Sequence, residues 1–64
     1  MKIMWTNKLS KEQGYVRVVH KDKGYFENTF DIKEAKNFQK RTVSATIAFL
    51  NECCKDNEYT EVVT

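Results

Sequence analysis

The sequence has no proline, two glycines, two cysteines and one histidine among its 64 residues. Without stretches rich in proline or glycine it has no linker, so residues 1–64 are expected to form a single domain. No apolar run approaches the roughly 20 residues that a membrane-spanning helix needs, and no membrane association is expected. A chain this short buries only about 60% of the surface that it exposes when unfolded, which excludes a deep, enclosed cofactor site.

The cysteines do not indicate a disulfide framework or a metal site. Cys53 and Cys54 are adjacent, so a bond between them would strain the backbone and would join no distant parts of the chain. His20 lies too far along the chain to complete the spacing of zinc ligands. Met1–Trp5 is too short and too polar for a signal peptide. These features together predict a cytoplasmic protein.

Charge is distributed unevenly along the chain. Residues 1–41 carry a net charge of +5 and residues 42–64 a net charge of −3, which gives the total of +2. This total is well below that of a dedicated nucleic-acid binder, although the basic part is long enough to form a local patch. A solvated surface of mixed charge is the simpler interpretation.

The clearest local pattern predicts a β-hairpin from Tyr15 to Phe30. Residues 15–20 and 25–30 are rich in β-branched and aromatic side chains, and Gly24 suits the left-handed position of a three-residue loop. With Lys21 facing Tyr25, one face of the hairpin points to the core and carries Val16, Val18, Phe26 and Phe30. The other face carries Tyr15, Arg17, Val19, Tyr25, Glu27 and Thr29.

Helical signals follow the hairpin. Asp31 with Glu34 three residues later has the form of an N-cap, so a helical turn is expected from Ile32. The principal helix is predicted over Thr42–Cys54, with Thr42 as its N-cap, from apolar residues spaced by three and four: Val43, Ile47, Leu50 and Cys54.

One alternative for the helical region remains open. One continuous helix over Ile32–Cys54 also fits the apolar spacing, but a break near Lys40 is preferred because polar residues 39–42 interrupt the pattern. After the helix, Asn57 is the expected left-handed residue.

Short alternating segments at both ends complete the expected sheet. Tyr59–Val63 and Lys2–Thr6 both suit strands, and the residues from Asn7 to Gln13 suit a polar loop. The predicted fold is therefore α+β: a three- or four-stranded, mainly antiparallel sheet with one principal helix packed on one face, in the order β-β-β-α-β. Trp5, paired at the edge of this sheet, would cap the core.

The sequence offers little that catalysis requires. His20 stands beside charged residues at the end of the hairpin, with no nucleophile or paired carboxylates to act with it. Gly14 and Gly24 are ten residues apart and neither opens a helix, so there is no phosphate-binding loop. We therefore expect no enzyme activity, no cofactor and no catalytic or metal-binding residues.

Binding of another protein is the favoured hypothesis. A sheet of three or four strands leaves an edge unpaired, and such edges recruit a strand from another chain unless they are blocked. The expected interaction surface comprises Tyr15, Arg17, Val19, Tyr25 and Trp5. Self-association through the same edge is a variant of this hypothesis. Alternatively, Tyr15, Val19 and Tyr25 lie beneath a terminal strand or the N-terminal loop.

Nucleic-acid binding is the second hypothesis. Tyr15 and Tyr25 would stack bases, while Arg17 and the lysines of the hairpin loop would contact phosphates. The sequence lacks the aromatic-glycine signature of an RNA-recognition motif, and Glu27 places a negative charge on the same face.

The order of these segments resembles a group of known proteins. A hairpin, the segment from Asp31 to Phe38, a helix with Ala45 and Phe49, and a final Tyr-Thr-Glu-Val-Val strand cover about residues 15–63. In this order they resemble small uncharacterised proteins of bacteriophages and prophages of Gram-positive bacteria. The resemblance implies a small cytosolic α+β domain without catalytic residues that binds a host or phage macromolecule.

Overall fold

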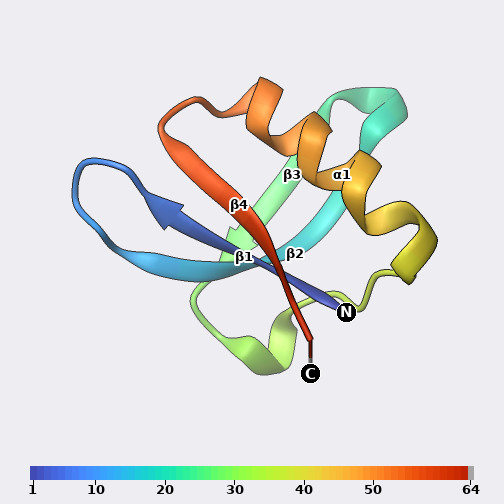
Figure 1. Ribbon diagram of the computed structural model, residues 1–64, viewed down its shortest axis with the longest axis horizontal. Helices are drawn as coiled ribbons and strands as arrows, with labels where there is room; N and C mark the ends of the chain where they lie inside the picture. Colours follow the sequence, from blue (N-terminus) through green and yellow to red (C-terminus); the bar gives the residue numbers. More distant parts are fainter. Residues whose placement is uncertain (64) are drawn as a thin grey trace.

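The structure is a computed structural model and describes residues 1–63. Its elements are β1 (Lys2–Asn7), β2 (Gln13–His20), β3 (Tyr25–Thr29), α1 (Lys40–Cys53) and β4 (Asn57–Val62), with short 3-10 turns at Lys21–Lys23 and Ile32–Glu34 (Figure 1). The strands pair antiparallel in the order β3-β2-β1-β4. The predicted α+β fold with the order β-β-β-α-β is confirmed. The described residues include no helix that is long and apolar enough to cross a membrane.

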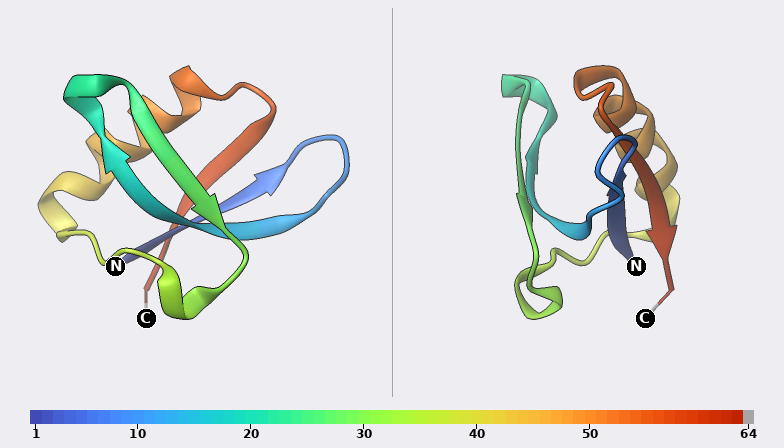
Figure 2. Two further views of the ribbon diagram at one scale, coloured as in Figure 1. Left: turned by 180° about the vertical axis from the view of Figure 1, so that it is seen from behind. Right: turned by 90° about the vertical axis from the view of Figure 1, so that its left-hand side faces the viewer.

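The sheet is strongly curved because β2 belongs to two pairings in succession. Its first residues, Gln13–Tyr15, pair with β1, and its later residues pair with β3. A bulge at Arg17 shifts the β2–β3 register between the pairs Val16–Asn28 and Val18–Glu27, and bulges bend the strand that carries them. The β2–β3 hairpin therefore stands on one side of the molecule and β1, β4 and α1 on the other (Figure 2, right).

The core fills the space between these two sides. Its fully or largely buried side chains are Ile3, Trp5, Val16, Val43, Leu50 and Tyr59. α1 supplies two of them from one face, together with the buried Thr46, whose hydroxyl donates to the Thr42 carbonyl oxygen at 3.0 Å. This bond within the helix satisfies the hydroxyl, so the buried Thr46 needs no partner from the sheet.

A glycine shapes the corner where β2 leaves β1. The indole of Trp5 lies over Gly14 and donates from Nε1 to the Tyr15 carbonyl oxygen at 3.0 Å. A Cβ atom at Gly14 would lie 2.5 Å from the Trp5 ring, so only glycine fits. Phe30 meets the same indole edge-on, with 5.4 Å between ring centroids. Trp5 is thus part of the core, and the expectation that it lies at an edge of the sheet is wrong.

An extended segment before α1 joins the two halves of the sheet. The Lys36 N–H donates to the Val16 carbonyl oxygen at 3.0 Å. Phe38 exchanges two hydrogen bonds with Met1, of 2.6 Å and 3.0 Å. Residues 35–39 therefore occupy the gap that opens where β1 and β2 diverge.

The hairpin differs from its prediction in register. Its loop has four residues, Lys21–Gly24, so Tyr25 pairs with His20 instead of Lys21. Gly24 does adopt the predicted left-handed conformation, with φ of 63°. Because of the longer loop and the bulge, Val19 packs against the core.

Two further side chains of the hairpin are affected by the same change. Val18, predicted for the core face, pairs with Glu27 on the outer side. Phe30, also predicted for the core, is 69% exposed. Both predictions are wrong. The bulge in β2 changes the face of Val18, which strict alternation does not describe. Phe30 lies after the end of β3 at Thr29 and directly before the cap at Asp31, so the alternation of the strand does not extend to it.

The helical predictions are confirmed in outline and wrong at the boundaries. The Asp31 carboxylate accepts from the Lys33 N–H at 2.9 Å and caps the turn Ile32–Glu34. The break before the principal helix is confirmed, but α1 begins at Lys40 after Gln39, and Thr42 is not its N-cap. 

The predicted end of the helix also changes. Cys54 ends α1 in an extended conformation, and Asn57 is the first residue of β4 rather than a left-handed cap. The turn between them is consequently short, and it brings β4 directly back along the helix.

Candidate functional site

β3 forms one edge of the sheet, and the pairing assigns its outward-facing backbone groups. The Val16 carbonyl oxygen accepts from Lys36, so it points away from β3. Val16 and its partner Asn28 are therefore a non-hydrogen-bonded pair, in which each residue directs its N–H and C=O away from the other. Two residues earlier, Phe26 has the same orientation. The free edge thus presents the N–H and C=O groups of Phe26 and Asn28.

Nothing in the described part of the chain covers this edge. No hydrogen bond from another segment of residues 1–63 reaches the backbone of Phe26 or Asn28. The opposite edge of the sheet is different, because the Tyr59 N–H of β4 donates to the Asn51 side chain of α1 at 3.1 Å. α1 therefore occupies the outward N–H of Tyr59 in β4, whereas the outward groups of Phe26 and Asn28 in β3 have no such partner.

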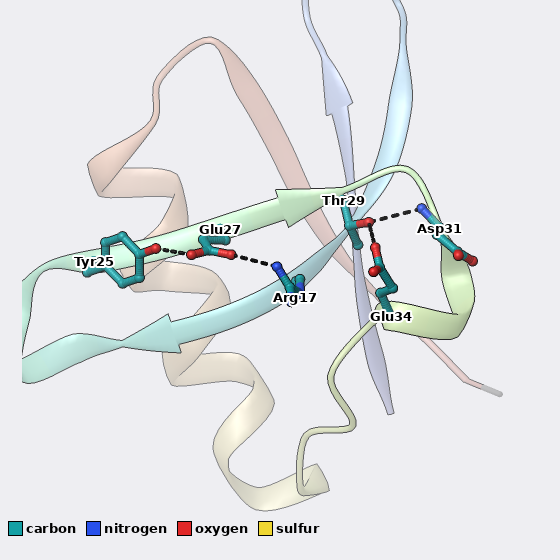
Figure 3. Close-up of polar contacts among 6 residues, drawn as sticks. All are labelled: Arg17, Tyr25, Glu27, Thr29, Asp31 and Glu34. Carbon is teal, nitrogen blue, oxygen red and sulfur yellow. Dashed lines mark hydrogen bonds and ion pairs between the residues drawn. The ribbon is translucent and has the colours of Figure 1, made fainter.

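The outer face beside this edge carries an ordered set of polar contacts (Figure 3). The Glu27 carboxylate accepts from Arg17 at 3.1 Å and from the hydroxyl of Tyr25. The hydrogen bond to Glu27 raises the pKa of the Tyr25 hydroxyl above its usual value, with smaller contributions from burial and from the charge of Glu27. Glu27 is thus engaged by both neighbours and holds them over the middle of the hairpin.

A second set of contacts fixes the end of β3. The Thr29 hydroxyl donates to the Glu34 carboxylate at 2.9 Å and accepts from the Asp31 N–H at 3.1 Å. The Glu34 carboxylate, three residues after the cap at Asp31, therefore contacts β3. These bonds hold the turn Ile32–Glu34 against the strand (Figure 3).

Exposed apolar side chains lie at both ends of β3. Tyr25 is 45% exposed at the start of the strand, where its ring stacks on His20 with 6.0 Å between centroids. Phe30 is 69% exposed directly after the strand, and Ile32 is 43% exposed in the following turn. An approaching chain would meet apolar surface on either side of the free backbone groups.

The predicted interaction surface is divided by the fold. Tyr15, Arg17 and Tyr25 lie on the outer face of the hairpin as predicted. Val19 and Trp5 instead pack in the core and are not available on that face. The sequence reasoning missed Phe30 and the backbone of Asn28. The N-cap at Asp31 could have indicated that Phe30 is exposed, because a residue directly before a helix cap lies outside the regular strand.

Other reactive side chains do not form a site with these residues. Cys53 is exposed and Cys54 half-buried, and both are free thiols. In residues 1–63, His, Cys, Asp and Glu side chains do not gather in groups of three around one point. We therefore assign no residue to a metal ion.

Comparison with known proteins adds no relative. No protein-family model, no curated protein and no solved structure matches the chain. The resemblance to small phage and prophage proteins consequently stays a prediction.

Proposed function

We propose that the protein is a small, non-catalytic binding module that takes up an extended segment of a partner protein as an additional strand along β3. The observation that carries this proposal is the uncovered backbone of Phe26 and Asn28. Unpaired strand edges bind extended segments through main-chain hydrogen bonds, and side chains beside the edge set the specificity.

β3 also lacks the devices that commonly block an edge. It contains no lysine and no proline, and its one charged side chain, Glu27, is paired with Arg17. The bulge at Arg17 lies in β2, on the inner side of the pair, and leaves the outer edge of β3 regular. Tyr25 and Phe30 supply aromatic anchors of the kind that interfaces favour.

The partner that we propose is a different protein in the cytoplasm, of bacterial host or phage origin, in keeping with the resemblance of the sequence. A second copy of this chain is the competing occupant of the edge. Two copies joined edge to edge through β3 would give a symmetric dimer whose population rises with protein concentration.

The outer face favours a protein partner over a nucleic acid. Glu27 lies between Arg17 and Tyr25 and accepts a hydrogen bond from each. A phosphate approaching Arg17 would meet this carboxylate, and Arg17 and Tyr25, two of the residues expected to contact nucleic acid, already bind to it.

The test uses two variants of one residue. Asn28→Pro removes the outward N–H without removing a hydrogen bond to β2, whereas Asn28→Ala keeps that N–H and removes the side chain. A library of random ten-residue peptides is selected against the immobilised protein, and enriched peptides are then measured against both variants. We expect Asn28→Ala to bind like the parent protein and Asn28→Pro to bind at least tenfold more weakly.

Three outcomes contradict the proposal. The first is that selection enriches no peptide. The second is that enriched peptides bind Asn28→Pro and Asn28→Ala with equal affinity. The third is that the amide shifts caused by binding fall outside β3. Sedimentation equilibrium distinguishes the competing occupant, because a dimer that Asn28→Pro dissociates would show that a second copy occupies the edge. Amide spectra of both variants verify that each is folded.

A further inference from the structure

A second surface lies on the other side of the same hairpin. An open groove with a volume of about 600 Å³ runs between the end of β2, the hairpin loop, the extended segment 36–39 and the first half of α1. In Figure 2, left, the hairpin loop and the start of α1 both lie toward the left of the molecule, in the two layers that the right-hand view separates. This groove is separate from the β3 edge, which faces away from β2.

The groove is bordered by unpaired cations. Lys21 and Lys36 line it, and Lys23, Lys40 and Arg41 stand beside its lining residues in the chain. Asp22 is the one acidic residue of the lining. Within residues 1–63 the ion pairs are Arg17–Glu27 and Lys55–Glu52, so none of the five cations has a carboxylate within 4.0 Å. Lysines thus outnumber Asp22 in the lining, and an anionic ligand would meet a mainly positive field there.

One wall of the groove is a free strand edge. Val19 pairs with Phe26, and this pair repeats the orientation of Val16 with Asn28, so Val19 directs its N–H and C=O away from β3. β1 has already left β2 after Tyr15, and no strand of residues 1–63 pairs with Val19 on that side. The edge of Val19 thus borders the groove, which distinguishes this site from a merely basic patch.

Apolar and polar groups alternate around this edge. Val19 and Phe38 are partly buried against the core and line the groove. The Lys36 ammonium lies 5.6 Å from the centre of the Phe38 ring, which places the charge at the rim of this apolar surface. An extended peptide directs successive side chains to opposite sides, so alternating aliphatic and acidic residues would match the two kinds of surface.

We infer that this groove binds an extended acidic peptide segment, which pairs with the backbone of Val19 and directs its carboxylates to Lys21 and Lys36. The free N–H and C=O of Val19 favour a peptide over a nucleic acid, because a peptide backbone supplies both complementary groups. The inference does not depend on the function proposed for the β3 edge.

The probe is a capped peptide of five Val-Glu repeats, titrated into the ¹⁵N-labelled protein at low salt. We expect amide shifts at Val19, Lys36 and Phe38. The double variant Lys21→Glu/Lys36→Glu should weaken binding at least tenfold, because it removes two charge contacts of about 0.7 kcal/mol each. The control Lys8→Glu/Lys11→Glu makes the same change in net charge in the β1–β2 loop and should weaken binding less than twofold.

Asn28→Pro separates this site from the β3 edge and should leave the affinity for the Val-Glu peptide unchanged. The inference is overturned if the peptide causes no shifts at these three amides, or if both charge-reversed variants lose affinity equally. It is also overturned if a ten-residue thymidine oligonucleotide binds the same residues more tightly than the peptide does. A matched Val-Lys peptide should not bind.

Discussion

Substitution of Gly14 by alanine tests the corner where β2 leaves β1. The added Cβ would lie 2.5 Å and 2.6 Å from two carbons of the Trp5 indole and 2.7 Å from the Thr29 carbonyl oxygen. Non-bonded carbons pack at about 3.5–4.0 Å, so the indole or the backbone must shift by about 1 Å. Neither can move freely. The Trp5 indole is 7% exposed and hydrogen-bonded to the Tyr15 carbonyl oxygen, and the Thr29 oxygen belongs to the backbone of β3.

The expected cost is large for a domain of this size. Overpacking of a core costs about 1–3 kcal/mol, and loss of the hydrogen bond from Trp5 to Tyr15 adds about 1 kcal/mol. The smaller conformational freedom of alanine in the unfolded chain offsets about 0.5 kcal/mol. We expect Gly14→Ala to lower the free energy of unfolding by about 1.5–3.5 kcal/mol, which is much of the roughly 3–5 kcal/mol that such a small core supplies.

Urea denaturation followed by tryptophan fluorescence measures this cost, since Trp5 is the single tryptophan of the chain. Gly24→Ala is the matched control. Its Cβ would have no neighbour within 4 Å, but φ is +63°, so it should cost about 1 kcal/mol through backbone conformation alone. If Gly14→Ala costs no more than Gly24→Ala, the argument from the packing of Trp5 is refuted.

Burial raises the pKa of the Tyr59 hydroxyl above 10.0, although hydrogen bonds with Asn57 and Asn28 act in the opposite direction. Because the folded state has the higher pKa, the free energy of unfolding should fall as pH rises above about 10, and Tyr59→Phe should lessen this fall in urea titrations at about pH 9 and 11. Asn51→Ala leaves the Tyr59 N–H without its partner and should lower the free energy of unfolding by about 1 kcal/mol. The control Glu52→Ala changes an exposed neighbour and should lower it by less than about 0.5 kcal/mol. Arg17→Ala should lower the free energy of unfolding by at most about 1 kcal/mol, and by less in high salt, because the ion pair with Glu27 is exposed. A larger loss of stability would contradict the placement of this ion pair on the surface.

The order and type of the elements followed from the sequence because each depends on local signals. These signals determine the conformation of only a few neighbouring residues. They are the β-branched run of β2, the cap at Asp31 and the left-handed Gly24. The hairpin register did not follow, because the bulge at Arg17 and the four-residue loop both shift the pairing, and strict alternation describes neither. With the bulge, Val16 and Val19 both reach the core at a spacing of three, which a regular strand does not allow.

The candidate site was predictable only in part, for a related reason. Tyr15, Arg17 and Tyr25 were placed on the outer face from chain alternation alone. Whether an edge is open depends on strand order and on where α1 returns, and neither is a local property. The protection of β4 by Asn51 and the exposure of Asn28 both required the three-dimensional arrangement.

The strand order has a consequence for how the chain folds. β1 is a central strand, yet its second neighbour, β4, comes last among the described elements, after all three other strands and the helix. During synthesis the β1–β2–β3 meander can form first. The edge of β1 opposite β2 stays unpaired until β4 has been synthesised and has docked. In that interval β1 offers a free edge that includes Ile3 and Trp5. Slow arrival of β4 would therefore expose the nascent chain to pairing with other copies, and conditions that accelerate β4 docking should improve the yield of folded protein.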